Sequence, residues 1–186
     1  ISSPGPVTLN GANDVNNLAA TVTTAGNTFA FSDTDDLTVT TVDGVTGITT
    51  VNGPITLASG TTLTLTDPVD AGAAGTITLN NNGLATVAGT LTAGTLNLLG
   101  AGNVGSLANR INTTVNTIVL GKFGGDTFVN ESGAVNLQGT SAGGNVDVVA
   151  NGAITLAGVL NLGAGSATLD STTISLAGFD LTGGTV

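Results

Sequence analysis

The 186-residue chain carries 2 Lys or Arg against 12 Asp or Glu, a net charge of −10, and it contains no His, Cys, Met, Trp or Tyr. Two basic side chains are too few to neutralise a phosphate backbone or to bind an anionic lipid surface. We therefore exclude nucleic-acid binding and expect no membrane insertion. The missing His and Cys remove the ligands of zinc and redox-metal sites and the usual partners of nucleophilic catalysis.

The first 36 residues show little regular pattern. They contain Pro4, Pro6 and the acidic run Asp33-Thr34-Asp35-Asp36. We expect residues 1–36 to form an irregular N-terminal capping coil, with regular coils over residues 37–186 in one domain covering residues 1–186. The absence of Met predicts a processed form or a piece of a longer chain.

From residue 37 onward, a triplet of aliphatic, small or polar, and aliphatic residues recurs. Its first residues are 17 to 22 positions apart, with a mean step of 137/7, and they are Leu37, Ile55, Ile77, Leu96, Ile118, Val135, Ile154 and Ile174. A repeat of about 20 residues is typical of a solenoid. We therefore predict an all-β, right-handed parallel β-helix of about nine coils of about 20 residues, with the handedness taken from the crossover preference of parallel strands.

Strict alternation within the runs favours strands over helices. In Thr62–Thr66 and Thr76–Asn80, the aliphatic residues fall on one face and the polar residues on the other. Asn-Gly pairs such as Asn52-Gly53 and Asn151-Gly152 provide the corners. An antiparallel sandwich would also show short strands, but it would normally have an aromatic core and no such period. We expect extra loops at residues 67–75 and 103–132.

One segment concentrates the charges that a polysaccharide-cleaving site would need. Arg110, Lys122, Asp126 and Glu131 lie close together in the sequence, and such enzymes place carboxylates with Arg or Lys in a groove. The simpler interpretation is that these are solvated loop charges. We predict no catalytic residues, no cofactor and no enzymatic activity.

Calcium is the candidate metal, because the chain has carboxylate oxygens but no His or Cys. Asp33, Asp35 and Asp36 form one weak candidate site. Asp126 is the other, because Gly121–Val129 matches the calcium-binding nonapeptide G-G-x-G-x-D-x-U-x except at Lys122. Sites of that class need successive copies of the motif, and this chain has one, so the alternative is a polar corner without an ion.

Two stretches resemble the filamentous haemagglutinin-like repeats of large secreted bacterial exoproteins and adhesins. They are Leu37–Leu57 and Val129–Leu156, which includes Val129-Asn130-Glu131-Ser132-Gly133-Ala134-Val135-Asn136-Leu137 and Asn151-Gly152-Ala153-Ile154-Thr155-Leu156. The resemblance implies a right-handed parallel β-helix, export to the cell surface or medium, and a role in adhesion or the extracellular matrix. It corresponds to the shaft of such proteins.

These observations predict a structural module of an extracellular bacterial surface fibre or adhesin, a rigid shaft without catalysis. Its partners would be flanking repeats of a longer chain, with host or matrix glycans or proteins as further ligands. The first alternative is a self-assembling filament subunit in which identical chains stack head to tail. The second is a carbohydrate-binding or carbohydrate-active β-helix, although the aromatic residues on which sugars usually stack are almost absent.

Overall fold

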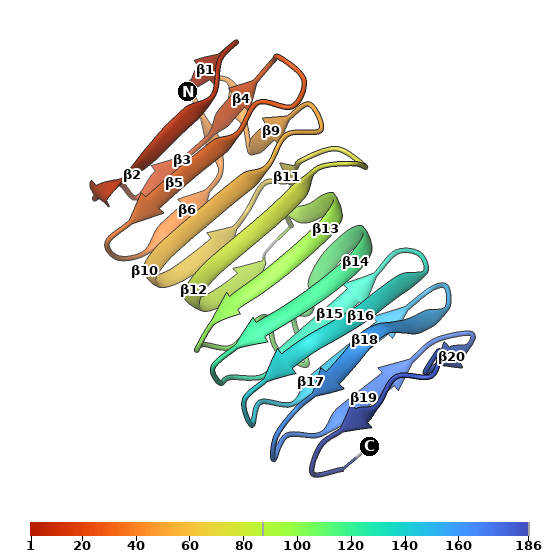
Figure 1. Cartoon of the computed structure of the whole chain (residues 1–186). Coiled ribbons are helices and arrows are strands. Elements are labelled where there is room, and N and C mark those ends of the chain that lie inside the picture. Colours follow the sequence, from red (N-terminus) through yellow and green to blue (C-terminus); the bar gives the residue numbers. More distant parts are fainter. Residues whose placement is uncertain (87, 186) are drawn as a thin grey trace.

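The computed structural model describes residues 1–86 and 88–185, and across these residues the chain forms strands and no helix. The strands wind into one elongated solenoid with the N-terminus at one end and the C-terminus at the other (Figure 1). Their bounds are β1 Ser2–Ser3, β2 Val7–Asn13, β3 Asn17–Leu18, β4 Ala20–Val22, β5 Phe29–Asp33, β6 Leu37–Val39, β7 Thr41–Val42, β8 Val45–Thr46, β9 Ile48–Thr50, β10 Ile55–Leu65, β11 Val69–Asp70, β12 Thr76–Thr86, β13 Thr90–Gly100, β14 Ile111–Lys122, β15 Thr127–Glu131, β16 Val135–Ser141, β17 Val146–Ala150, β18 Ile154–Asn161, β19 Ala167–Asp170, β20 Ile174–Ser175 and β21 Leu181–Thr182.

The strands stack in three parallel columns, which we call the first, second and third faces. The first face contains β2 and β5, the first parts of β10 and β12, the last parts of β13 and β14, and then β16, β18 and β20. The second face contains β3 and β6, the last parts of β10 and β12, and the first parts of β15, β17 and β19. The third face contains β1, β4, β9 and β11, the first parts of β13 and β14, and the last parts of β15, β17 and β19. Strand β21 pairs with the end of β18.

The predicted parallel β-solenoid is confirmed, with about 8 turns of about 21 residues in place of nine coils of about 20. The register on the first face shows where the longer coils lie. Phe29 pairs with Ile55, whereas Ile77 pairs with Leu96 and Ile118 with Leu137, so the coil that begins at Phe29 is clearly longer than the other two. Eight steps of about 4.8 Å give a rod of roughly 38 Å between the first and last strands of this face.

The early part of the chain is more regular than its sequence pattern indicates. Val7 pairs with Phe29 and Leu9 with Phe31, so residues 1–36 already contain strands of the solenoid. The triplet Leu37-Thr38-Val39 lies on the second face, where Leu37 pairs with Leu63. The sequence pattern conceals these early strands because aromatic residues at 29 and 31 replace the usual aliphatic pair.

The longest coil of the first face carries an antiparallel hairpin, β7–β8, in which Thr41 pairs with Thr46 and Val42 with Val45. Its turn is Asp43-Gly44, and both residues have positive φ angles, 49° and 80°. This is the geometry of the two-residue turn that matches the twist of a hairpin. The repeat-like pattern of Leu37–Leu57 hides the Asp-Gly signal, so the predicted length of this coil is too short.

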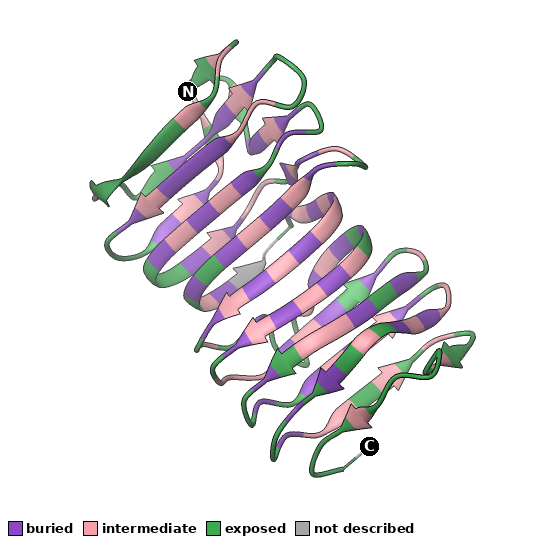
Figure 2. Cartoon of the chain, viewed as in Figure 1, coloured by how far each residue is buried: buried purple, intermediate pink, exposed green. Residues whose placement is uncertain are grey.

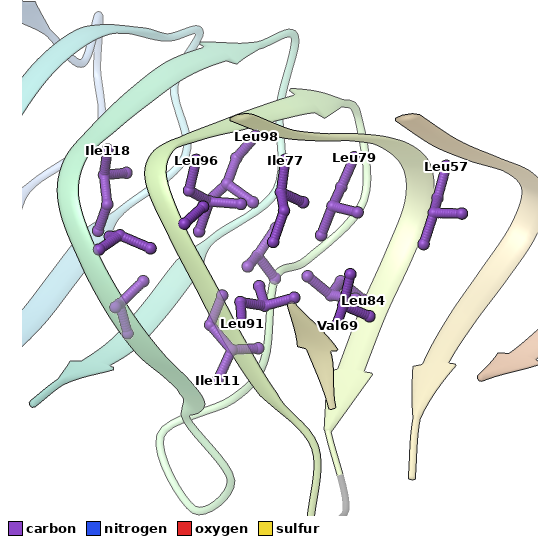
Figure 3. Packing of buried hydrophobic residues seen from close by; sticks show 14 of the residues in the cluster. Leu57, Val69, Ile77, Leu79, Leu84, Leu91, Leu96, Leu98, Ile111 and Ile118 are labelled. Carbon is purple, nitrogen blue, oxygen red and sulfur yellow. The ribbon is translucent and has the colours of Figure 1, made fainter. Parts of the chain in front are cut away.

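The inward and outward assignment of the triplets is confirmed for the interior coils. Ile55, Leu57, Ile77 and Leu79 have no exposed surface, and Figure 2 shows buried and partly exposed positions alternating along these strands. Figure 3 shows such side chains filling the interior of the tube coil above coil. Stacked aliphatic ladders and strand hydrogen bonds therefore account for the stability of the solenoid.

Candidate functional site

The charged segment of the middle coils begins with a loop, Ala101–Arg110, that joins β13 to β14. A single bridge residue, Val104, keeps this loop attached to the second face by pairing with Leu84 and Thr127. The expected extra loop thus occupies the first part of residues 103–132, and strands β14 and β15 take up most of the remainder.

Arg110 ends this loop and forms a bidentate ion pair with Asp147. Its Nη1 lies 2.9 Å from Asp147 Oδ1 and its Nη2 lies 2.8 Å from Oδ2. The guanidinium carbon also lies 5.9 Å from the centre of the Phe128 ring, within reach of a cation–π interaction. Arg110 therefore fastens the loop to the second face, and it pairs with a carboxylate for which the sequence pattern gives no signal.

Lys122 is buried, with 2% of its surface exposed, and its Nζ donates a hydrogen bond of 2.5 Å to the Gly102 carbonyl. Burial lowers the pKa of the ammonium below its ordinary value, and the nearby Asp126 carboxylate partly offsets this effect. In the register, Lys122 pairs with Gly100 on one side and Ser141 on the other. The side chain lies at an inner corner and holds the loop from within, so it is not a solvated loop charge.

Glu131 occupies an inward-facing position at the end of β15 and is 1% exposed. Its Oε2 accepts hydrogen bonds from Thr113 Oγ1 at 2.7 Å and from the Val115 amide at 3.1 Å. Its Oε1 accepts from the Gly133 amide at 3.0 Å and from Ser132 Oγ at 3.3 Å. The carboxylate thus ties the loop that follows β15 to strand β14 of the preceding coil.

The proposed arrangement of Arg110, Lys122, Asp126 and Glu131 as one charged groove is not what the structure shows. Each of them bonds to a different part of the fold. The interpretation as solvated loop charges is also wrong for Lys122 and Glu131, because both are almost completely buried. A sequence signal existed for Glu131, which falls at an inward position of the alternating run Thr127–Glu131.

The acidic run at residues 33–36 lies at the corner between β5 and β6. Asp33 is 5% exposed, and its two oxygens accept hydrogen bonds from the amides of Val15 and Asp35. Asp36 Oδ1 accepts from the Thr62 amide and the Thr61 hydroxyl, which lowers its pKa. Partial desolvation, the hydrogen bond with Asp33 and nearby carboxylates raise the pKa of Asp35. Within residues 1–86 and 88–185, no group of three or more acidic side chains is arranged to hold a metal ion.

Asp126 belongs to a ladder of Asn and Asp side chains along one corner of the second face. The Asp126 amide donates to Asn103 Oδ1, the Asn145 amide donates to Asp126 Oδ1, and the Ser166 amide donates to Asn145 Oδ1, at 2.8–2.9 Å. Each side chain therefore caps the backbone of the following coil. This role explains the nonapeptide-like position of Asp126 without an ion, and the recurrence of Asn or Asp at 103, 126 and 145 was the available signal.

A notch lies at the corner between the third and first faces. Strands β13 and β14 pass through this corner without interruption, whereas the flanking coils carry the loops Ala71–Gly75 and Ser132–Ala134. The first of these is the extra loop expected at residues 67–75, shortened by strand β11. Figure 1 shows β13 and β14 turning inward of the loops on either side. The hollow between these loops has a volume of about 360 Å³, and a second hollow of about 300 Å³ continues from it across Asn116 and Ala134.

The two ends of the solenoid expose parts of its core. At the C-terminal end, Ala167, Leu169, Ile174, Leu176 and Leu181 line an apolar hollow of about 470 Å³. Ile174 is 49% exposed, although its partner in the preceding coil, Ile154, has no exposed surface. At the other end Leu9 is 38% exposed. Figure 2 shows the same contrast between the terminal and interior coils.

No family model matches the chain, and neither the curated proteins nor the solved structures contain a match. The described residues also contain no helix long and apolar enough to cross a membrane. The comparisons therefore identify no family for this β-solenoid. The resemblance to haemagglutinin-like repeats is used below only in the proposed function.

Proposed function

We propose that the chain is a rigid, non-catalytic shaft segment of an extracellular bacterial surface fibre or adhesin. The observation that carries this proposal is that both ends of the solenoid are uncovered. Core positions such as Leu9, Ile174 and Leu176 are exposed there, and the end strands have an open edge on which a further coil can pair. In a solenoid each coil is stabilised mainly by its neighbours, so such ends favour continuation of the stack. Flanking repeats of the same chain are the proposed neighbours.

The charged residues support a structural role. Arg110 joins the loop to Asp147, and Lys122 holds the Gly102 carbonyl. Glu131 accepts two hydrogen bonds from the preceding coil and two from its own loop. The Asn and Asp ladder uses further polar side chains for coil stacking. Export to the cell surface is part of this proposal, and the resemblance to secreted exoproteins supports it.

A tandem fusion of two copies tests the shaft proposal. If the second copy continues the first, covering Ile174 and Leu176 at the junction raises the free energy of unfolding, and the two copies unfold together in urea. The matched control carries Leu176→Asp at the junction only. Two copies that unfold independently at the midpoint of the single copy would overturn the proposal. Protease added to intact producing cells tests surface exposure, which requires loss of the protein without lysis.

A filament of identical subunits is the second candidate, and one observation favours it. Val7-Thr8-Leu9 at one end and Ile174-Ser175-Leu176 at the other belong to the same column of the first face, with their strands running in the same direction. A second copy would therefore continue the column head to tail, a contact that does not close on itself.

Sedimentation velocity and electron microscopy over a range of concentrations test the filament. The expected result is linear growth with concentration that Leu176→Asp abolishes. Leu107→Asp is the control, because Leu107 is 69% exposed on the loop of the middle coils, away from both ends. Uniform monomers at every concentration would overturn the filament candidate.

A further inference from the structure

The notch at the corner between the third and first faces has a physical origin in the length of its corners. Ala93 pairs with Val115 and Thr95 with Thr117, so only Gly94 and Asn116 turn the chain in these two coils. A Cβ atom on Gly94 would lie 2.7 Å from the Ala73 carbonyl oxygen, so glycine permits the tight corner. The longer loops of the coils on either side then stand above it as walls.

The floor and walls differ in chemistry. Ala93 and Val115 form the floor, which is the buried bottom of the hollow, and its accessible apolar surface comes from the exposed Ala73 and Ala134 of the two walls. Exposed polar side chains surround it: Thr114 Oγ1 lies 2.9 Å from Ser132 Oγ, and the Asn116 amide is exposed where the two hollows meet. The notch thus combines a small apolar surface with several groups that both donate and accept hydrogen bonds.

The wall formed by Ser132 and Gly133 is held in place by the buried Glu131 carboxylate. The same carboxylate binds the Val115 amide in the floor, so floor and wall are connected through one charged group that is 1% exposed. Polar groups fixed in this way lose little freedom on binding a ligand, which favours recognition by a small number of contacts. Glu131 is accordingly a positioning residue.

We propose that this notch binds a neutral saccharide of one or two sugar rings. Sugar hydroxyls, which donate and accept, match Thr114, Asn116 and Ser132, and a C–H face of the ring would lie against the exposed Ala73 and Ala134 of the walls. The volume of about 360 Å³ is at the lower end of small-molecule sites. Among the described residues, no Lys or Arg lines either hollow, and Glu131 is the one charged group that does, so the site disfavours anionic sugars. This inference stands independently of the shaft function.

Titration of the ¹⁵N-labelled chain with cellobiose, maltose and N,N′-diacetylchitobiose tests the proposal by NMR. At least one of these sugars is expected to shift the amide signals of Asn116 and Ser132 in a saturable manner, while an anionic disaccharide does not. Asn116→Ala and Ser132→Ala should each weaken binding at least fivefold. Asn151→Ala is the control, because Asn151 is exposed at the same corner but lines neither hollow.

Glu131→Gln tests the positioning role separately. It should weaken saccharide binding while the thermal unfolding curve remains cooperative and the signals of the other coils stay in place. The proposal is wrong if none of the three neutral sugars shifts these signals at tens of millimolar, if the shifts persist in Asn116→Ala and Ser132→Ala, or if the anionic disaccharide binds equally well.

Discussion

The interior and terminal coils carry nearly the same triplet in very different surroundings. Ile154-Thr155-Leu156 is covered on both sides and its two aliphatic residues are at most 1% exposed, whereas Ile174 and Leu176 in the next coil are 49% and 47% exposed. The sequence of a coil therefore determines which side chains point inward. Whether they are buried depends on the presence of a following coil.

The largest effect is expected from truncating the interior core. Leu96→Ala, at a position with no exposed surface, should lower the free energy of unfolding by about 2–5 kcal/mol because it leaves a cavity between stacked coils. Leu176→Ala should lower it by less than about 1 kcal/mol, since that side chain is already half exposed. Urea denaturation of both variants measures the difference, and equal losses would contradict the comparison.

Glycines with positive φ provide a second contrast. Gly139 has a φ of 116°, and a Cβ atom there would lie 2.0 Å from the Leu120 carbonyl oxygen of the preceding coil. Gly139→Ala should therefore destabilise the chain by about 2–4 kcal/mol. Gly178, near the C-terminal end, has a φ of 81° with no atom within 4 Å of such a Cβ. Its replacement by Ala should cost about 1 kcal/mol, from backbone strain alone. Thermal unfolding of the two variants should show this order.

Removing the ion pair of the middle coils should have a moderate effect. Arg110→Ala eliminates the bidentate contact with Asp147 and the contact with Phe128, and both charged side chains are less than one-fifth exposed. We expect a loss of about 1–2 kcal/mol. Hydrogen exchange should rise first in the loop Ala101–Arg110. Exchange that rises equally in β18 and beyond would show that the pair does not act locally.

The smallest effect concerns pH. Because burial lowers the pKa of Lys122, the unfolded chain binds more protons at this group than the folded chain does between the two pKa values. The cost of burying the ammonium is fully present at lower pH and is relieved as the pH rises toward the ordinary lysine pKa of about 10.4.

The stability of the parent relative to Lys122→Met should therefore increase as the pH rises toward the ordinary lysine pKa, by at most about 1.4 kcal/mol for each pH unit by which burial lowers the pKa of Lys122. Urea denaturation at several pH values measures this slope. A difference that falls with rising pH would show that the folded state favours the charged amine.

The fold could be predicted from the sequence because aliphatic alternation and a regularly spaced triplet both report on stacking. The coil count was less accurate, since the Asp43-Gly44 hairpin and the Ala101–Arg110 loop add residues without adding a turn. Phe29 and Phe31 concealed the early strands. The charged residues were the hardest to place. Alternation in Thr127–Glu131 indicates the inward position of Glu131, but neither the spacing nor the pattern indicates what Lys122 contacts or that Arg110 pairs with Asp147.

The β7–β8 hairpin shows how such a protein can change its surface without changing its interior. The coil that carries it is the longest on the first face, yet the strands on both sides pair in register with their neighbours. The strand register and the core packing therefore do not depend on the length of the insertion at this corner, provided that the chain re-enters the solenoid at Ile48. The solenoid should therefore fold with peptides of other lengths, including epitopes or binding segments, in place of Asp43-Gly44. It could serve as a scaffold that displays such peptides at a defined corner.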